Sequence, residues 1–141
     1  MTQITINTDG GARGNPGPAG IGYVIAKDGA VVKEVGEYIG ETTNNQAEYE
    51  ALVRALTTLK ELLGSDMDAT IEARLDSELV VKQLRREYKV KDAGLKTQFA
   101  KVQEILATLP KVTFVHVMRE ENSEADALVN EALDAQSAKI Q

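Results

Sequence analysis

Residues 2–11 read Thr2-Gln-Ile-Thr-Ile-Asn-Thr-Asp9-Gly10-Gly11, and this stretch decides how the N-terminal half of the chain is interpreted. Its first seven residues alternate between apolar and polar side chains, with Ile4 and Ile6 on one face, which is typical of a β-strand. Asp9 follows directly, and the glycine- and proline-containing residues 10–18 indicate a loop. The pattern predicts a strand over 2–8 that ends in a carboxylate beside a glycine-rich loop.

The same reasoning places further elements along the rest of the chain. Strands are expected over 20–27, 30–39, 69–75 and 111–118, and helices over 46–63, 78–87, 93–109 and 124–135. Asp28-Gly29 is typical of a hairpin turn, and Ser77 is expected to cap a helix. Gly64 and Pro110 are expected to end helices. The order β-β-β-α-β-α-α-β-α predicts an α/β layered fold with a mixed sheet of five strands.

Length and composition narrow the class of protein. The 141 residues favour one domain, expected over 1–135, with a frayed tail over 136–141. There is no apolar run long enough to cross a membrane and no charged-then-apolar leader after Met1, so we expect a cytoplasmic protein without membrane contact. Cysteine is absent and there is one histidine, which excludes thiolate and histidine-rich metal sites. Any bound metal would have oxygen ligands, which favours Mg²⁺ or Mn²⁺.

The charge distribution is uneven. The net charge of −6 argues against a nucleic-acid partner, but residues 82–101 carry seven basic against two acidic side chains, a local charge of +5. A cluster of carboxylates that binds cations would offset four more negative charges. The overall charge therefore neither establishes nor excludes a polyanionic substrate.

Four carboxylates occupy positions at which they can converge. Asp9 and Asp76 each end an expected strand, and ligand sites in open α/β sheets lie at such strand ends. Glu48 lies in the first turn of a helix, at the head of the apolar stripe Leu52, Leu56, Leu59 and Leu63, and Asp126 aligns in the same way with Val129 and Leu133. Acids that face a core need a compensating partner. Two hard cations about 4 Å apart are a known solution for phosphodiester hydrolysis, with Asp9 as the natural bridging ligand.

Simpler interpretations of the same residues remain open at this point. Asn45-Gln46-Ala47-Glu48 and Ser123-Glu124-Ala125-Asp126 both fit the spacing of a capping box, in which an acid follows the cap by three residues. Asp9 before Gly10 also fits an isolated turn. The cluster hypothesis depends on the joint pattern of all four acids.

Four segments together resemble type 1 ribonuclease H, over about residues 4–134. The matching segments are Thr8-Asp9-Gly10-Gly11 with Asn15-Pro16-Gly17, Thr42-Thr43-Asn44-Asn45-Gln46-Ala47-Glu48, Asp76-Ser77-Glu78, and Asn122-Ser123-Glu124-Ala125-Asp126-Ala127-Leu128. The resemblance implies the ribonuclease H fold, with sheet order 3-2-1-4-5 and the second strand antiparallel to the rest. It implies a monomer that cuts the RNA strand of RNA–DNA hybrids and leaves 5′-phosphate and 3′-hydroxyl ends.

The resemblance also implies roles for individual residues. Asp9, Glu48, Asp76 and Asp126 match the ligands of two Mg²⁺ or Mn²⁺ ions. Asn44 and Asn45 match residues that contact the hybrid in its minor groove, including RNA 2′-hydroxyls, and Thr43 matches a position that binds a phosphate of the DNA strand. The backbone amides of Gly11 and Asn15 are expected to approach the RNA.

The chain departs from the family pattern in two places. Many members have a catalytic histidine in the loop before the fourth acid, whereas Arg119 takes that position here, as in an archaeal-like subgroup. His116 falls within an expected strand, where a packed or surface role competes with a catalytic one. The basic protrusion of many members is reduced to Lys89-Val90-Lys91, which predicts weaker substrate affinity.

Three alternative functions stay open. A nuclease of the same fold would also cut double-stranded RNA. A non-catalytic module would bind hybrids without cleaving them. A generic α/β interaction protein would use all four acids as helix caps and would gain no stability from Mg²⁺ or Mn²⁺.

Overall fold

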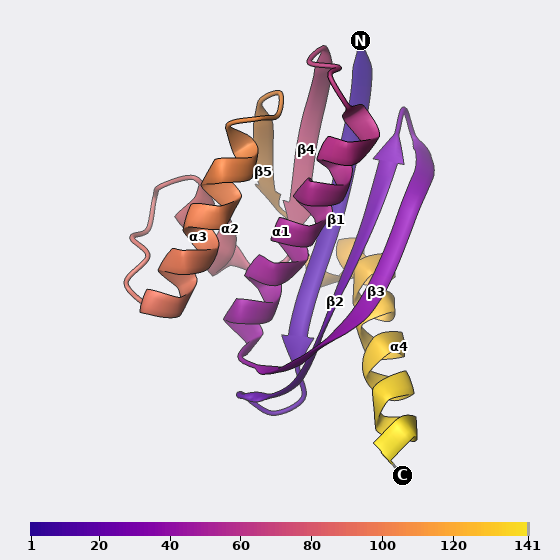
Figure 1. Ribbon diagram of the computed structural model, residues 1–141, viewed down its shortest axis with the longest axis vertical. Coiled ribbons are helices and arrows are strands. Elements are labelled where there is room, and N and C mark those ends of the chain that lie inside the picture. The colour runs from indigo at the N-terminus through magenta and orange to yellow at the C-terminus, as the bar shows by residue number, and fades with distance from the viewer. Residues whose placement is uncertain (141) are drawn as a thin grey trace.

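The computed structural model describes residues 1–140, which form a five-stranded sheet with helices packed on both of its faces (Figure 1). The strands are β1 (Thr2–Ala12), β2 (Gly17–Lys27), β3 (Ala30–Thr42), β4 (Ala69–Leu75) and β5 (Val112–His116). The helices are α1 (Asn44–Leu63), α2 (Glu78–Leu84), α3 (Ala93–Leu106) and α4 (Ser123–Ile140), with the 3-10 turn η1 (Arg119–Asn122) before α4. Within the described residues, no helix combines the length and the apolar character needed to cross a membrane.

The sheet has the order β3-β2-β1-β4-β5, as the resemblance implies. β2 pairs antiparallel with both β1 and β3, and β4 pairs parallel with β1 and with β5. The hairpin between β2 and β3 turns at Asp28 and Gly29, both with positive φ, which confirms the hairpin expected there. The expected fold class is therefore confirmed.

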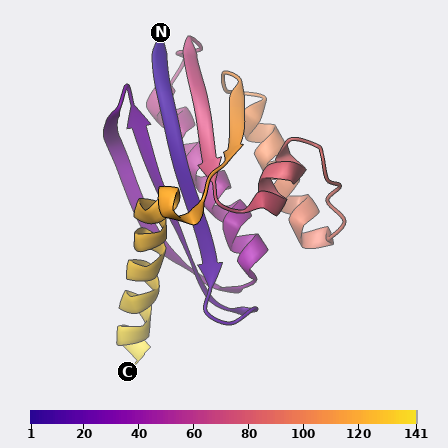
Figure 2. The same cartoon turned by 180° about the vertical axis from the view of Figure 1, so that it is seen from behind.

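The helices divide between the two faces of the sheet. α1 packs on β1 and β2 with α3 beside it, while α4 packs on β1, β2 and β3 from the opposite side. Seen from behind, α4 lies in front of the strands and α1 lies beyond them (Figure 2). On α1, three members of the expected apolar stripe, Leu52, Leu56 and Leu59, are fully inaccessible to solvent against Ile4 and Ile6 of β1, while Leu63 is partly buried. This core holds the start of α1 and the centre of β1 in fixed relation.

Several element boundaries differ from the sequence expectation. β1 extends through Ala12, because Gly10, Gly11 and Ala12 pair with β2, so the expected loop over 10–18 shrinks to four residues. α2 ends at Leu84 rather than 87, and Arg86 just beyond it adopts a positive φ of 63°, a conformation that a helix does not allow. Ser77 caps α2 and Gly64 ends α1, as expected.

The C-terminal helix is longer than the sequence indicates. α4 begins at Ser123 and extends through Ile140, whereas the pattern predicts a helix over 124–135 followed by a frayed tail over 136–141. Residues 136–140 are therefore helical, and residue 141 lies outside the described part of the chain.

Candidate active site

The two strand-end carboxylates lie side by side. Thr8 pairs with Leu75 as the last step of the parallel ladder between β1 and β4, and Asp9 and Asp76 are the next residues of the two strands. Parallel strands bring equivalent positions to the same edge of a sheet, which is the geometry that the sequence predicts for these two acids. Because β4 ends here while β1 continues, the edge of β1 is open beyond Thr8, and side chains from both faces of the sheet can meet there.

Glu48 reaches this edge from α1. The backbone amide of Gly10 donates to Glu48 Oε1 at 3.3 Å, and a Cβ atom at Gly10 would lie 2.3 Å from the Ala47 carbonyl carbon and oxygen. Glycine is therefore required for α1 to approach β1 so closely. The helix is capped by Thr43, whose Oγ1 accepts from the Gln46 amide at 3.2 Å, so the capping box proposed for Asn45 and Glu48 is wrong.

Asp126 arrives from the opposite face. Gly22 is the β2 partner of Asp9, and a Cβ atom at Gly22 would lie 2.4 Å from the carbonyl oxygen of Ala125. α4 therefore packs directly on the backbone of β2, which brings Asp126 beside Asp9. The Asp126 side chain is 33% exposed, and its Oδ2 accepts from Asn130 Nδ2 at 3.4 Å.

The first three carboxylates form a tight cluster, and Asp126 lies at its rim. Asp9, Glu48 and Asp76 each offer an oxygen that lies within 4.8 Å of the others. Asp9 and Glu48 are only 6% and 7% exposed. All four acids line an open cleft of about 450 Å³. The structure thus brings together the four acids that the sequence singles out.

The electrostatics of the cluster are unfavourable without a bound cation. Burial, together with the charges of Asp76 and Asp126, raises the pKa of Asp9 to about 7. Burial and the charges of Asp9 and Asp76 raise the pKa of Glu48 well above its ordinary value. Burial also raises the pKa of Asp76, against the opposing effects of the Asn122 side chain and the Arg119 guanidinium. The metal-free cluster consequently retains protons near neutral pH.

The donor set fits a hard divalent cation. Glu48 Oε2 is buried and has no hydrogen-bond partner among the described residues, although buried carboxylate oxygens are normally satisfied. A cation between the carboxylates would supply that partner and also cancel their mutual repulsion. Because every donor of the cluster is a carboxylate oxygen, the cluster suits a hard divalent cation.

The expected substrate-contacting residues lie beside the cluster and brace one another. Asn44 Oδ1 accepts from the Ala12 amide at 2.8 Å, and Asn15 Oδ1 accepts from the Asn44 amide at 3.0 Å. Asn44, Asn45 and Gly11 line the cleft. Asn15 holds Asn44 in place, and Thr43 caps α1, so both have structural roles irrespective of any contact with substrate. The substrate-binding assignments of these residues stay predictions.

The structure adds one residue to the site and separates two others. Asn122 is 1% exposed, and its Nδ2 donates to the Thr8 carbonyl at 2.8 Å, so it ties η1 to β1 next to Asp9. The sequence offers little signal for this, because the surrounding residues are charged and suggest a surface. Arg119 lines the cleft with Nη2 3.9 Å from Asp126 Oδ1, whereas His116 is exposed at the end of β5 and is not among the residues that line the cleft.

A 3-2-1-4-5 sheet with an acidic cluster at the end of its central parallel pair defines the class of ribonuclease H-like folds. Residues 7–132 match the family described as reverse transcriptase-like. Ribonuclease HI of Halobacterium salinarum is 45% identical over 127 residues, which cover 89% of this chain and 62% of that protein. A mycobacterial relative is 38% identical, and the match spans 36% of its length.

Solved structures are similar over nearly the whole chain. A ribonuclease H1 isolated from compost shares 54% identity with a TM-score of 0.91, over 96% of this chain and 99% of that one. The same ribonuclease in complex with an RNA/DNA hybrid shares 51% identity with a TM-score of 0.90, over 96% and 99% of the two chains. This chain therefore belongs to the type 1 ribonuclease H family. It spans less than two thirds of the curated relatives named above.

Proposed function

We propose that this protein is an endoribonuclease that hydrolyses the RNA strand of RNA–DNA hybrids with the help of two divalent ions, Mg²⁺ or Mn²⁺, and leaves 5′-phosphate and 3′-hydroxyl ends. One observation carries the proposal: three carboxylate oxygens lie within 4.8 Å of one another at the end of the central strands, and one buried oxygen of Glu48 has no hydrogen-bond partner in the part of the chain that the structure describes. A protein with only a structural role would gain nothing from the mutual repulsion of these clustered carboxylates. The hybrid-bound relative supports the choice of substrate.

In this proposal the chain supplies ligands and orientation. The ions would be held by four carboxylates, Asp9, Glu48, Asp76 and Asp126. Asp9 has the central position among them. The ions would lower the pKa of an attacking water and stabilise charge on the leaving 3′ oxygen. Arg119 lies at the rim of the cleft, where its positive charge faces Asp126 and the approaching phosphate.

Recognition of RNA would fall to the first turn of α1. Asn44 Oδ1 is used by the Ala12 amide, so its Nδ2 group remains to donate toward the cleft, and Asn45 beside it can both donate and accept. Such amides suit the 2′-hydroxyl, the group that distinguishes RNA from DNA. The hydrogen bond from the Ala12 amide keeps the Asn44 side-chain amide oriented before substrate arrives, while Asn15 holds the Asn44 backbone.

The test is incubation of purified protein with labelled RNA–DNA hybrid, RNA duplex and DNA duplex, each with EDTA, Mg²⁺ or Mn²⁺. We expect metal-dependent cleavage of the RNA strand of the hybrid, with 5′-phosphate ends. Cleavage of the RNA duplex as well would extend the substrate range to double-stranded RNA. Hybrid binding without cleavage in any metal would overturn the enzymatic proposal in favour of a binding module.

A further inference from the structure

Three polar side chains of α4 form a ladder that begins at the rim of the cleft, where Asp126 and Asn130 line it. Asp126, Asn130 and Asp134 are spaced by four residues and therefore share one face of the helix. Asn130 Nδ2 donates to the Asp126 carbonyl at 3.1 Å and to its Oδ2 at 3.4 Å. The ladder thus begins at a proposed metal ligand and runs away from it along the helix.

Arg13, in the loop between β1 and β2, meets the end of this ladder. Its Nη2 donates to Asn130 Oδ1 at 3.4 Å and lies 2.7 Å from Asp134 Oδ1. Both contacts use Nη2, so in the described part of the chain Nε and Nη1 remain available to another acceptor. The Arg13 side chain is 45% exposed and lines the cleft, so the guanidinium can be reached from solvent.

The position of Arg13 favours a contact with substrate. Among the described residues, the basic side chains that line the cleft are Arg13 and Arg119. Arg119 lies 3.9 Å from Asp126, whereas Arg13 contacts Asn130 and Asp134 farther along α4. In the sequence, Arg13 also lies between Gly11, which lines the cleft, and Asn15, which accepts from the Asn44 backbone amide. A polyanion that enters this acidic cleft therefore meets the Arg13 guanidinium at its rim, and guanidinium groups bind phosphate through paired hydrogen bonds.

The ion pair between Arg13 and Asp134 is weak. The Asp134 side chain is 70% exposed, and ion pairs between exposed groups contribute little stability. A phosphate can therefore take the guanidinium from Asp134 without breaking a buried interaction. Asp134 acts as a competitor that neutralises Arg13 while the cleft is empty of substrate.

We propose that Arg13 is a substrate-binding residue that contacts a backbone phosphate of the RNA strand, and that Asp134 weakens this contact by competing for the same guanidinium. The proposal rests on the proposed function, because it takes an RNA–DNA hybrid as the substrate. It assigns opposite effects on hybrid affinity to the two partners of one ion pair, which a purely structural ion pair would not produce.

The experiment measures hybrid binding by fluorescence anisotropy as a function of NaCl concentration, in the Asp9→Asn background to prevent cleavage, and kcat and KM in the active protein. Arg13→Gln is expected to raise Kd roughly tenfold at low salt, the effect of losing one hydrogen bond to a charged group. It should also reduce the slope of log Kd against log salt by about 0.9, the value for one phosphate contact. KM should rise more than kcat falls.

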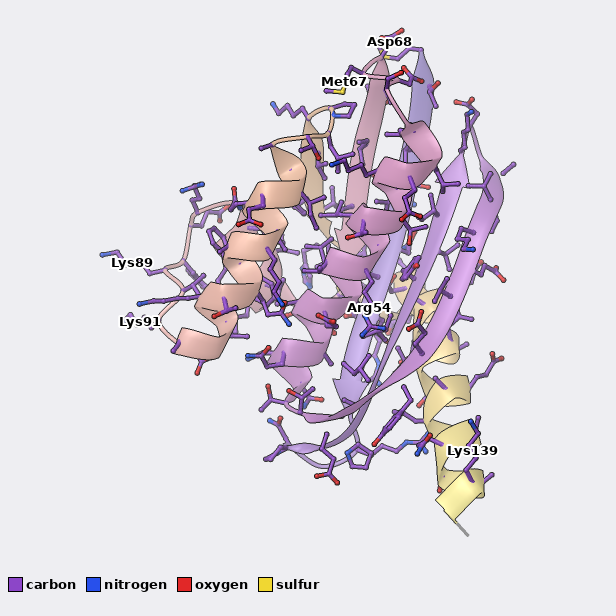
Figure 3. The ribbon with its side chains drawn as sticks, viewed as in Figure 1. Arg54, Met67, Asp68, Lys89, Lys91 and Lys139 are labelled. Atoms are coloured by element: carbon purple, nitrogen blue, oxygen red, sulfur yellow. The ribbon has the colours of Figure 1, made fainter. Side chains whose placement is uncertain are left out.

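Asp134→Asn is expected to lower Kd, and the double variant Arg13→Gln/Asp134→Asn should bind as Arg13→Gln does. Arg54→Gln is the matched control, since the Arg54 side chain on α1 is 37% exposed and is paired with Glu50 and Glu37 (Figure 3). Arg54 is not among the residues that line the cleft. The control substitution removes the same charge and should leave the salt slope unchanged.

Two results would overturn the inference. One is a salt slope for Arg13→Gln that equals that of Arg54→Gln. The other is a parallel loss of affinity in Arg13→Gln and Asp134→Asn, which would assign the ion pair to holding the loop against α4. The proposed function is tested separately, with the wild-type protein alone. If the wild-type protein neither binds nor cuts hybrid, the proposed function is wrong, whatever the variants show.

Discussion

Two adjacent residues of α1, Glu48 and Tyr49, show two ways in which a protein can bury a polar group. Tyr49 is fully buried, and its hydroxyl donates to Gln83 Oε1 at 2.6 Å, so both groups satisfy each other inside the core. Glu48 is 7% exposed, yet one of its oxygens has no partner within the described residues, and its nearest charged neighbours are other carboxylates. The first arrangement is complete within the chain, whereas the second requires a ligand.

The contrast separates a stabilising polar contact from a functional one. A neutral hydrogen bond in a core offsets its own desolvation, while clustered carboxylates destabilise the fold unless a cation binds them. Substitutions at Tyr49 should therefore affect stability and spare activity, and substitutions in the cluster should do the reverse.

The largest expected effect is the loss of cleavage in Asp9→Asn. Asp9 is the central carboxylate of the proposed metal site, and even outer partners of metal ligands are worth about 10- to 100-fold in activity. We expect the rate of hybrid cleavage to fall by more than about 100-fold, with an unchanged circular dichroism spectrum. Cleavage at the wild-type rate would remove Asp9 from the catalytic site.

A second expectation concerns the pH dependence of metal-free stability. The folded-state pKa of Asp9 is about 7 against 3.8 for an ordinary aspartate, so the folded protein binds more protons than the unfolded chain between these values. Stability then falls as pH rises through this window. In EDTA, the free energy of unfolding of Asp9→Asn should be close to that of the wild type near pH 4 and exceed it by roughly 4 kcal/mol near pH 7.5. Urea unfolding at several pH values measures this, and a pH-independent difference would contradict it.

Divalent ions should stabilise the fold through the cluster. At a concentration of Mn²⁺ about 100 times its Kd, binding to the folded state alone contributes about 2.7 kcal/mol. We expect a rise in Tm with Mn²⁺ for the wild type and for Tyr49→Phe, and a much smaller rise for Glu48→Gln. Equal shifts in all three proteins would place the bound ion outside the cluster.

The smallest effect is expected for the buried hydrogen bond between Tyr49 and Gln83. Tyr49→Phe leaves Gln83 Oε1 buried without its donor, which should cost about 1–3 kcal/mol of folding free energy. The kcat for hybrid cleavage should stay unchanged, because Tyr49 does not line the cleft. A fall in kcat larger than the loss of folded protein would contradict this, because it would mean that the Tyr49–Gln83 hydrogen bond also supports the acidic cluster.

The sequence by itself determined the elements and the identity of the acidic residues. Strand alternation at Ile4 and Ile6 and the helical stripe from Leu52 to Leu63 reflect periods of two and about 3.6 residues, which a local pattern can carry. The same periodicity places Glu48 at the head of a buried stripe and Asp9 at the end of a strand, so the cluster could be inferred before its geometry was known.

Only the tertiary structure decided how the site is assembled. The extension of β1 through Ala12 depends on pairing with β2, and the approach of α4 depends on a glycine that faces Ala125. Glu48 meets Gly10 across 38 residues of sequence, and Arg13 meets Asn130 across 117. Contacts of this kind arise from close packing between distant segments, and local periodicity contains no information about them. For the same reason no local pattern singled out Arg13, and Asn122 stood only within a segment of the family resemblance, with no sign that its side chain is buried against Thr8.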